Sequence, residues 1–347
     1  MPYHRAIFYL SFCLLLTACK DEHSTPAPDS TMIIYPAYGT VAQLDDRLGD
    51  ILPDSAAMQL LASGFEWSEG PLWIADGGYL LFSDIPRNAV MRWAPGDTVA
   101  QVYLQPSGYT GEAPFGGTEP GSNALLLDPQ GQLVLCQHGD RRMARMTAPM
   151  AQPTAQYETI VGSYDGKLLN SPNDAIYHSN GNLYFTDPPY GLPGGADSDA
   201  KMLDFQGVYR YSERDATLTL LTDALTRPNG LAFTPDEAQL IVANSNPDRA
   251  VWMSYTLQPD GTLGTGRVYY DATEQVANNK GLPDGMAMHS SGHLFATGPG
   301  GVYVFAPDQS LLGVLRTGQA TANCTFDDTE SHLYITADSL LLRLPMR

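Results

Sequence analysis

Residues 173–187 read NDAIYHSNGNLYFTD, and residues 284–298 read DGMAMHSSGHLFATG. Each segment starts with a polar residue, runs through a short apolar stretch into a turn, and resumes with apolar residues that begin at a leucine. Turn sequences such as Ser-Asn-Gly-Asn between two short apolar stretches are typical of β-hairpins. The same pattern occurs six times, starting at Glu69, Asn123, Asn173, Asn229, Asp284 and Asn323.

The spacing of the copies indicates a repeat architecture. In every copy the leucine follows the polar residue by ten or eleven positions, and the six leucines are 39 to 57 residues apart. A third apolar segment follows each hairpin, as in GVYRY (207–211), and in five copies a fourth follows, as in TLTLL (217–221). Four strands in each repeat of roughly 50 residues are typical of propeller blades. The sequence therefore predicts an all-β fold, a six-bladed β-propeller with four-stranded blades.

The sixth copy lacks a fourth strand of its own. Residues 57–63 (AMQLLAS) precede the first copy and are apolar enough to supply it. We therefore predict a ring closed by this N-terminal strand, which protects sheet edges that otherwise promote aggregation. The segment 40–53 is expected to form a short helix outside the ring.

The N-terminal residues resemble an export signal. Arg5 precedes an apolar run from Ala6 to Leu16 that is too short for a membrane span. Leu-Thr-Ala-Cys ending at Cys19 resembles a bacterial lipobox, with an ordinary secretory cleavage site as the alternative. We expect a signal peptide over 1–18, lipidation of Cys19, a flexible tether over 19–39 and the propeller over 40–347. The protein would then be an exported bacterial monomer, periplasmic or lipid-anchored to the outer membrane.

Composition narrows the functional classes. The 347 residues carry 38 Asp and Glu against 19 Lys and Arg, a formal net charge of −19. This acidity argues against nucleic-acid binding, which requires a basic surface. No later apolar run is long enough to span a membrane, so contact with a membrane is expected only through the lipid anchor. Cys136 and Cys324 lie in apolar segments, which favours buried free thiols over the one disulfide they might form in an oxidising compartment.

The first polar residue of each copy has a special place in a propeller. The first strand of a blade lies nearest the central channel, so residues at the same register converge at one mouth. The six residues carry carboxylate or amide oxygens and none is basic. Such oxygens form sites for hard cations, preferably Ca²⁺, with Mg²⁺ or Zn²⁺ possible. Asn-Gly at 229–230 and Asp-Gly at 284–285 are also turn formers, which leaves a purely structural reading open.

Longer motifs resemble a known family. The phrases WSEGPLW (67–73), CQHGDRR (136–142), SPND (171–174), RPNGLAF (227–233) and LPDGM (282–286) are similar to the gluconolactonase branch of the senescence marker protein/gluconolactonase/luciferin-regenerating enzyme family. The resemblance implies a six-bladed propeller with one divalent cation, usually Ca²⁺, at the channel mouth. It implies the metal ligands Glu69, Asn173, Asn229 and Asp284. Asn173 is alternatively a ligand for a substrate hydroxyl.

Substrate contacts are expected around that mouth. Asn123 lies in SNAL, where relatives often have SNGL. His138 and Arg141 follow the second strand of the second copy, where an arginine suits sugar hydroxyls or a carboxylate, although a solvated turn is the alternative. Glu119 and Tyr109 belong to the Gly- and Pro-rich segment 106–121, a composition found in loops that cap sites. Trp67, Trp73 and the DPPYG motif (187–191) are expected to be structural.

The sequence favours a metal-dependent hydrolase acting on sugar lactones. In this hypothesis the cation polarises the lactone carbonyl, and Asp284 is the candidate catalytic general base for the attacking water. A phosphotriester or other ester hydrolase on the same site is one alternative. A non-catalytic, calcium-stabilised, lipid-anchored binding propeller is the other.

Overall fold

The structure is a computed structural model that describes residues 33–347. The predicted signal peptide and Cys19 lie outside the described residues, as does most of the predicted tether. Residues 35–347 form one compact unit. None of its helices combines the length and the apolar character that crossing a bilayer requires.

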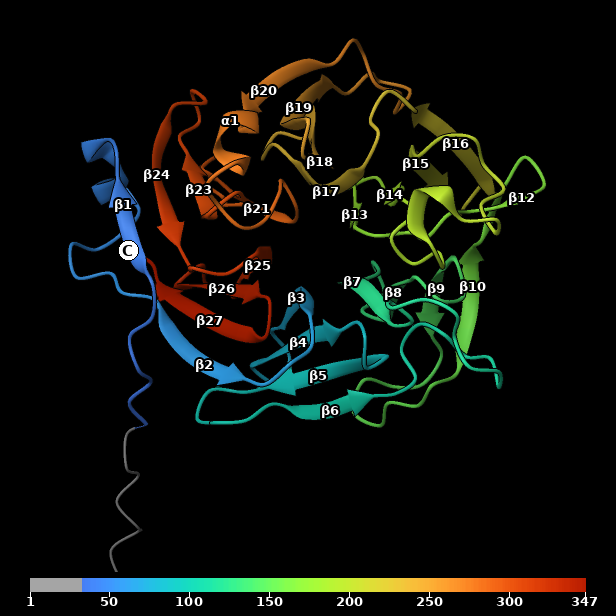
Figure 1. The fold of residues 1–347 in the computed structure, drawn as a ribbon, viewed down its shortest axis with the longest axis horizontal. Coiled ribbons are helices and arrows are strands. Elements are labelled where there is room, and N and C mark those ends of the chain that lie inside the picture. The colour runs from blue at the N-terminus through green and yellow to red at the C-terminus, as the bar shows by residue number, and fades with distance from the viewer. Residues whose placement is uncertain (1–32) are drawn as a thin grey trace, which may run out of the picture. The chain divides into compact units, whose positions relative to one another are not determined.

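The compact unit is a ring of six antiparallel sheets around a central channel, which confirms the predicted propeller (Figure 1). Blade one contains β3 (Ser68–Ile74), β4 (Tyr79–Asp84), β5 (Ala89–Trp93) and β6 (Gln101–Leu104). Blade two contains β7 (Ser122–Leu127), β8 (Leu133–Gln137), β9 (Arg142–Met146) and β10 (Tyr157–Val161). Blade three contains β13 (Ala175–Tyr177), β14 (Leu183–Asp187), β15 (Gly207–Ser212) and β16 (Thr217–Thr222).

Blades four to six follow the same order, with the first strand innermost. Blade four contains β17 (Pro228–Phe233), β18 (Gln239–Asn246), β19 (Arg249–Thr256) and β20 (Arg267–Asp271). Blade five contains β21 (Met286–Met288), β22 (Leu294–Gly298), β23 (Gly301–Phe305) and β24 (Leu311–Arg316). Blade six contains β25 (Thr321–Phe326), β26 (His332–Ala337) and β27 (Leu340–Pro345).

The N-terminal chain contributes two further strands. β2 (Gln59–Ser63) pairs with β27 and completes blade six, as predicted. β1 (Thr40–Gln43) pairs with β24 and gives blade five a fifth strand. The expected helix over 40–53 is therefore wrong for its first part: only η1 (Asp46–Asp50), a 3₁₀ turn, is helical there. The two end residues of β1 are exposed and its two central residues are half-buried, which fits an edge strand.

Few other elements lie outside the blades. A small hairpin joins β11 (Ser163–Tyr164) to β12 (Lys167–Leu168). A 3₁₀ turn, η2, spans Gly195–Asp197, and a one-turn helix, α1, spans Thr273–Val276. η2 lies in the connection between β14 and β15, and α1 lies in that between β20 and β21, so the ring itself is built from strands.

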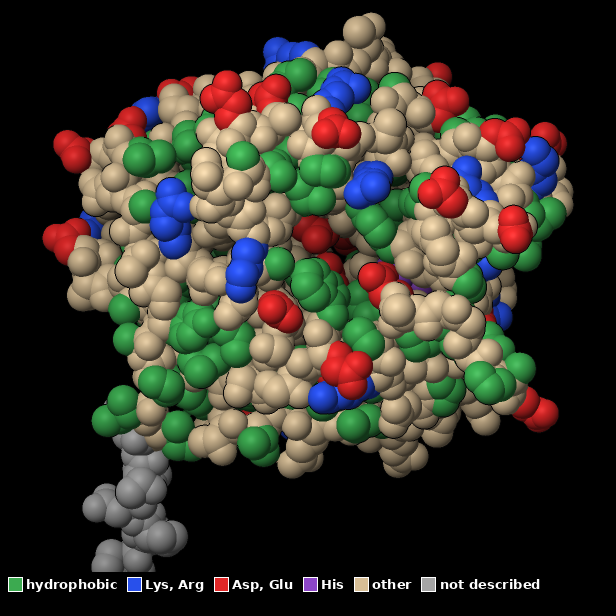
Figure 2. Space-filling view, viewed as in Figure 1, with side chains coloured by type: hydrophobic (Ala, Val, Ile, Leu, Met, Phe, Trp, Pro, Cys, Tyr) green, Lys and Arg blue, Asp and Glu red, His purple; other side chains and the backbone are tan. Residues whose placement is uncertain are grey.

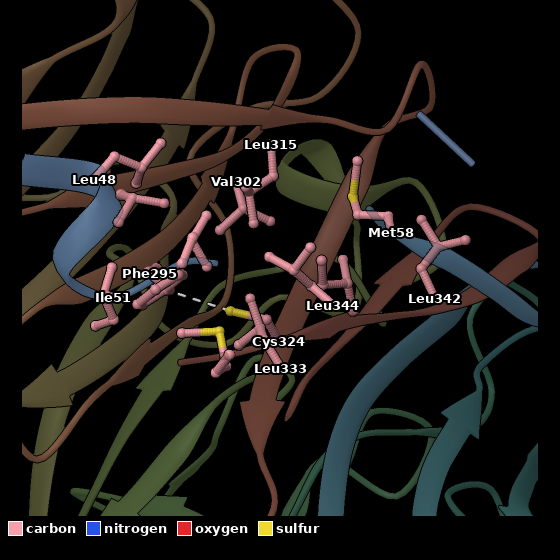
Figure 3. Packing of buried hydrophobic residues seen from close by; sticks show 14 of the residues in the cluster. Leu48, Ile51, Met58, Phe295, Val302, Leu315, Cys324, Leu333, Leu342 and Leu344 are labelled. Atoms are coloured by element: carbon pink, nitrogen blue, oxygen red, sulfur yellow. Dashed lines mark hydrogen bonds between the residues drawn. The ribbon is translucent and has the colours of Figure 1, made fainter. Parts of the chain in front are cut away.

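Apolar side chains fill the space between neighbouring blades. Figure 3 shows one such cluster, in which Leu48 and Ile51 from the η1 turn pack with Phe295 of blade five and Leu333 of blade six. Cys324 lies in this cluster and its Sγ is 3.5 Å from the carbonyl oxygen of Phe295. Cys136 lies in a different cluster, between blades two and three. Both thiols are buried and unpaired, as favoured from the sequence.

Candidate active site

A pocket of about 380 Å³ lies at one end of the central channel. Figure 2 shows the hollow at the centre of the ring, with acidic side chains inside it. Five of the six polar residues predicted from the repeat register line this pocket, namely Glu69, Asn123, Asn173, Asn229 and Asp284. The sixth, Asn323, lines a second cavity of about 580 Å³, formed by residues that come later along the same innermost strands, such as Leu231 and Met286. The register therefore gathers the polar residues as predicted, with one exception.

A local irregularity of the innermost strands directs these side chains inward. In blades one, two, four and six the pairing of the first strand with the second shifts register next to the polar residue, as between Glu69 and Leu72. In blades three and five the regular strand begins only after Asn173 and Asp284. A bulge bends a strand and re-aims its side chains, which ordinary alternation would turn toward the neighbouring blade.

Glycine after the polar residue lets adjacent blades approach each other. A Cβ on Gly230 would lie 2.2 Å from the carbonyl oxygen of Asp284 and 2.6 Å from Cα of Gly285. A Cβ on Gly285 would lie 1.9 Å from Cγ of Asn323. The Asn-Gly and Asp-Gly pairs are thus not turns. They are places where only glycine fits between two innermost strands.

Second strands hold the segments that lead into the site. The Asp187 carboxylate, at the end of β14, accepts hydrogen bonds of 2.8 Å from the main-chain N–H groups of Asn170 and Ser171. In the same way Asn244 of β18 accepts a bond of 2.9 Å from Arg227 N–H. These bonds anchor the SPND and RPNG motifs just before Asn173 and Asn229. Asp187 therefore has the structural role expected of the DPPYG motif.

The two carboxylates of the site, the buried Glu69 and the half-buried Asp284, repel each other. Glu69 is 2% exposed, and burial raises its pKa to about 8 although Oε2 accepts a 2.9 Å hydrogen bond from Gly70 N–H. Burial also raises the pKa of Asp284 well above its usual range, and the charge of Glu69 adds to the shift. No Lys, Arg or His lines the pocket to compensate them. One carboxylate oxygen of Asp284, Oδ1, is buried without a hydrogen-bond partner.

The amide of Asn229 has a defined orientation. Its Nδ2 donates a 2.9 Å hydrogen bond to Ser245 Oγ. That hydroxyl donates to the carbonyl oxygen of Pro283, so it has to accept from Asn229. The nitrogen of the amide therefore faces Ser245 and leaves Oδ1 as the free acceptor.

Three lining residues were missed or misjudged from the sequence. Trp67 and Tyr190 line the pocket, whereas both were expected to be structural, and Ser245 was not singled out. Trp73 does pack within the ring, stacked on Tyr334 at 5.2 Å. Tyr190 lies in the loop directly after β14, which ends at Asp187. Its place after a blade's second strand, at the channel mouth, is the signal that would have indicated it.

Loop 106–121 forms one wall of the pocket through Glu119. Asn88 Oδ1 accepts hydrogen bonds from the main-chain N–H groups of Ser107, Gly108 and Tyr109, which fixes the start of the loop. Tyr109 does not line the pocket and packs on Phe115 at 5.2 Å. The loop thus contributes Glu119 to the site, while Tyr109 stabilises the loop.

Neither residue expected from the CQHGDRR motif lines the pocket. His138 is fully buried, and its Nδ1 lies 3.1 Å from Oε2 of Glu119, so it touches a wall residue from behind. The guanidinium of Arg141 instead donates to the carbonyl oxygens of Leu169, Asn170 and Ala200. Because these carbonyls occupy the guanidinium, Arg141 joins loops around blade three and is not placed to bind a substrate.

Comparison with known proteins identifies relatives of this chain. Residues 67–339 match the family model "SMP-30/Gluconolactonase/LRE-like region". A gluconolactonase from Zymomonas mobilis is 40% identical over 320 residues, which cover 88% of this chain and 86% of that protein. A solved structure of a gluconolactonase from Xanthomonas campestris has a TM-score of 0.76 and 32% identity, covering 90% of this chain and 97% of that one.

A more distant solved structure shares the architecture alone. It is regucalcin, a calcium-binding protein from Agrobacterium tumefaciens, with a TM-score of 0.59 and 16% identity, covering 82% of this chain and 94% of that one. The family match covers most of the propeller, from Trp67 of the site to Ser339, between β26 and β27. The chain belongs to the SMP-30/gluconolactonase/LRE-like family.

Proposed function

We propose that this protein is a lactonase whose pocket holds one divalent cation, best suited to Ca²⁺, between Glu69, Asn173, Asn229 and Asp284. The observation that carries the proposal is the pair of carboxylates formed by the buried Glu69 and the half-buried Asp284, whose Oδ1 is buried, in a pocket lined by no basic side chain. Burying two like charges together is costly unless a cation compensates them.

The donor set was tested against the chemistry of the cation. Glu69 and Asp284 offer carboxylate oxygens, the buried Oδ1 of Asp284 has no other partner, and Asn229 presents its Oδ1. No cluster of three or more His, Cys, Asp or Glu side chains placed to hold a metal occurs among residues 33–347, so amide oxygens have to complete the set. Carboxylate and amide oxygens fit Ca²⁺, and the lack of His and Cys makes Zn²⁺ a poorer match.

When bound, such a cation polarises the carbonyl of an ester and makes a nearby water more acidic. The residues around it bind and orient the substrate, and one of them accepts a proton. Asn123 is 4% exposed and its carbonyl accepts a 2.7 Å hydrogen bond from Ser83 Oγ, so its amide faces the pocket from a fixed main chain. Asn123 is therefore placed to hold the lactone in position, and in this proposal Asp284 accepts the proton of the attacking water at a carboxylate oxygen.

The lactone class is supported by the relatives. The Zymomonas and Xanthomonas proteins are both named gluconolactonases, and this chain aligns with most of the length of each. The pocket volume of about 380 Å³ falls in the range of roughly 300–1,000 Å³ that is usual for small-molecule sites. A neutral cyclic ester suits a pocket whose charged lining residues are all acidic.

The proposal is tested by proton release from sugar lactones with and without a chelator, followed by addition of Ca²⁺, Mg²⁺ or Zn²⁺. We expect chelation to abolish turnover and Ca²⁺ to restore it best. Asp284→Asn should lower kcat by about 10²–10⁴-fold, the usual contribution of a general base. Asp76→Asn, at an exposed turn of blade one, is the matched control and should leave kcat unchanged. Near-normal rates in Asp284→Asn with the cation still bound would exclude Asp284 as the base.

The same assay separates the alternatives named from the sequence. Turnover of aryl phosphotriesters in preference to lactones would replace the lactonase proposal with a phosphotriesterase. No turnover of any lactone, together with a large fall in Tm on chelation, would indicate a binding propeller with a structural cation.

Export is a separate proposal that rests on residues 1–19. Cys19 would carry a lipid that anchors an otherwise periplasmic protein, and the part of the expected tether (19–39) that precedes the compact unit at Tyr35 would link the two. Labelled palmitate should enter the full-length protein and not the Cys19→Ser variant. Equal labelling of both would contradict lipidation at Cys19.

A further inference from the structure

Glu119 and His138 form a unit that the proposed chemistry does not use. Glu119 belongs to the pocket wall, and its side chain is 31% exposed. Behind it the imidazole of His138 is fully buried, with Nδ1 3.1 Å from Oε2 of Glu119. Neither ring nitrogen of His138 forms a hydrogen bond within the described residues, so the approach of Nδ1 to Glu119 is a close polar contact of the buried ring and not a formed hydrogen bond.

We propose that Glu119, positioned by His138, is the residue that recognises hydroxyl groups on the lactone ring and so makes the pocket selective for polyhydroxylated lactones. This inference rests on the proposed lactonase function and deepens it. His138 is the positioning residue in this scheme, since it lies behind the wall and does not line the pocket.

The burial of His138 explains why its contact fixes Glu119. An imidazole that is taken out of water without a partner costs free energy, and the carboxylate of Glu119 is the group within reach of Nδ1. Turning Glu119 away would leave the ring without a polar contact. The contact therefore holds one carboxylate oxygen toward the ring and leaves the other for the pocket.

Close packing of the main chain limits movement of the loop that carries Glu119. A Cβ on Gly108 would lie 2.2 Å from the carbonyl carbon of Gly121, so the two ends of the loop touch. A Cβ on Gly139 would lie 2.6 Å from the carbonyl oxygen of Pro120, next to Glu119. Thr110 donates to Asp140 from both its N–H, at 3.1 Å, and its Oγ1, at 2.6 Å. Glu119 is thus presented from a braced loop, as recognition of fixed hydroxyls requires.

The chemistry of the pocket assigns hydroxyls rather than an anion as the ligand of Glu119. An ionised carboxylate only accepts hydrogen bonds, so its partner has to donate. No basic residue lines the pocket, so the lining offers no cationic side chain to a carboxylate or phosphate on the substrate. Apolar side chains such as Trp67 and Leu282 complete the wall and suit the faces of a ring.

The test compares two six-membered lactones, D-glucono-1,5-lactone, which carries hydroxyls, and δ-valerolactone, which has none. Glu119→Ala should lower kcat/KM for the hydroxylated lactone by about 10–100-fold, mainly through KM, and change that for δ-valerolactone less than threefold. Glu112→Ala, an exposed residue of the same loop, is the control and should change neither. Equal losses on both lactones in Glu119→Ala would overturn the inference.

His138 is tested with His138→Gln and His138→Phe, and thermal melting shows which variants fold. Glutamine keeps a donor for Glu119 and should retain the preference for the hydroxylated lactone, while phenylalanine should lose it through KM with kcat nearly unchanged. If kcat falls and KM rises to the same extent on both substrates in both variants, His138 acts only structurally, which contradicts a positioning role.

Binding of 1,5-anhydro-D-glucitol separates this inference from the lactonase proposal. This cyclic polyol has the hydroxyls and no ester, so calorimetry reports recognition without turnover. Binding that weakens about tenfold in Glu119→Ala supports the inference even if no lactone is hydrolysed. Lactone hydrolysis without any effect of Glu119→Ala on polyol binding or on substrate preference would overturn it and leave the lactonase proposal standing.

Discussion

The two ends of the central channel are built from the same innermost strands and differ in chemistry. At one end the buried Glu69 and Asn229 lie with the half-buried Asp284, and no basic residue is among the lining side chains. At the other end the same strands contribute apolar side chains such as Leu231 and Met286, and the acidic residues at its rim are paired with histidines. We refer to these ends as the acidic mouth and the paired mouth.

Two similar ion pairs mark the paired mouth. Glu237 of blade four lies 3.3 Å from His178 of blade three, and Glu330 of blade six lies 3.2 Å from His289 of blade five. Each glutamate also accepts hydrogen bonds from the serine that follows the histidine. Asp174, which lines the same cavity, has no ionic partner among the described residues, and burial raises its pKa to about 7. The two mouths therefore differ in that Glu69 and Asp284 meet without a basic side chain at one, whereas Glu237 and Glu330 pair with histidines of neighbouring blades at the other.

The largest effect on stability and activity is expected from adding a side chain where two innermost strands touch behind the acidic mouth. Gly230→Ala places a methyl group 2.2 Å from the carbonyl oxygen of Asp284, and overpacking of this kind costs about 1–3 kcal/mol. Displacing Asp284 should also lower kcat/KM by about 10²-fold. Urea unfolding and lactone assays measure both effects. The control is Gly49→Ala, where no atom lies within 4 Å of the new Cβ; equal stability of the two variants would contradict the close-contact argument.

A smaller effect is expected from pH in the presence of a chelator. Burial raises the pKa of Glu69 in the folded protein to about 8 from an ordinary 4.5, so folding favours its protonated form. The cation-free protein is then most stable with Glu69 protonated, and it loses stability as pH rises from about 4.5 through about 8. Between pH 6 and pH 7.5 we expect the free energy of unfolding of the cation-free wild type to fall by about 1–2 kcal/mol more than that of Glu69→Gln.

Thermal melts of both proteins at several pH values, with chelator and then with Ca²⁺, measure this difference. Ca²⁺ should remove it, because the cation favours the ionised carboxylates. Parallel pH profiles for wild type and Glu69→Gln in chelator would show that Glu69 does not carry the buried charge.

The smallest effect is expected at the paired mouth. Glu330→Gln removes one charge from a pair whose side chains are 15% and 26% exposed, and exposed or half-exposed pairs contribute at most about 1 kcal/mol. We expect the free energy of unfolding, measured with urea, to fall by less than about 1 kcal/mol, and kcat/KM to stay unchanged. A tenfold loss of activity in Glu330→Gln would show that the two mouths are coupled.

Most of the fold was predictable because it repeats. Six copies of one hairpin pattern, each followed by further strands, predict the blades, and the missing strand of blade six predicts its pairing with β2. β1 was not predictable in this way. Its pairing with β24 depends on an edge left open by blade five, and nothing in residues 40–43 indicates which edge they meet.

The site was predictable to the extent that register places side chains. Glu69, Asn123, Asn173, Asn229 and Asp284 share a register position and do meet at one mouth. Tyr190, Trp67 and Ser245 come from loops and second strands, where no repeat fixes the direction of a side chain. His138 and Arg141 belong to the charged motif CQHGDRR, which favours an exposed turn. In the structure His138 is fully buried and Arg141 donates to main-chain carbonyls.

The sequence by itself determined the number of blades, the closure of the ring and the polar residues that lead each blade, because strand periodicity and repeat spacing are local properties. Only the tertiary structure decided which of those residues share a pocket, which acids go unpaired and how Glu119 stands against His138. Those relations depend on bulges, close glycine contacts and loop crossings between residues far apart in the chain, and distances of that kind are set when the blades pack against each other.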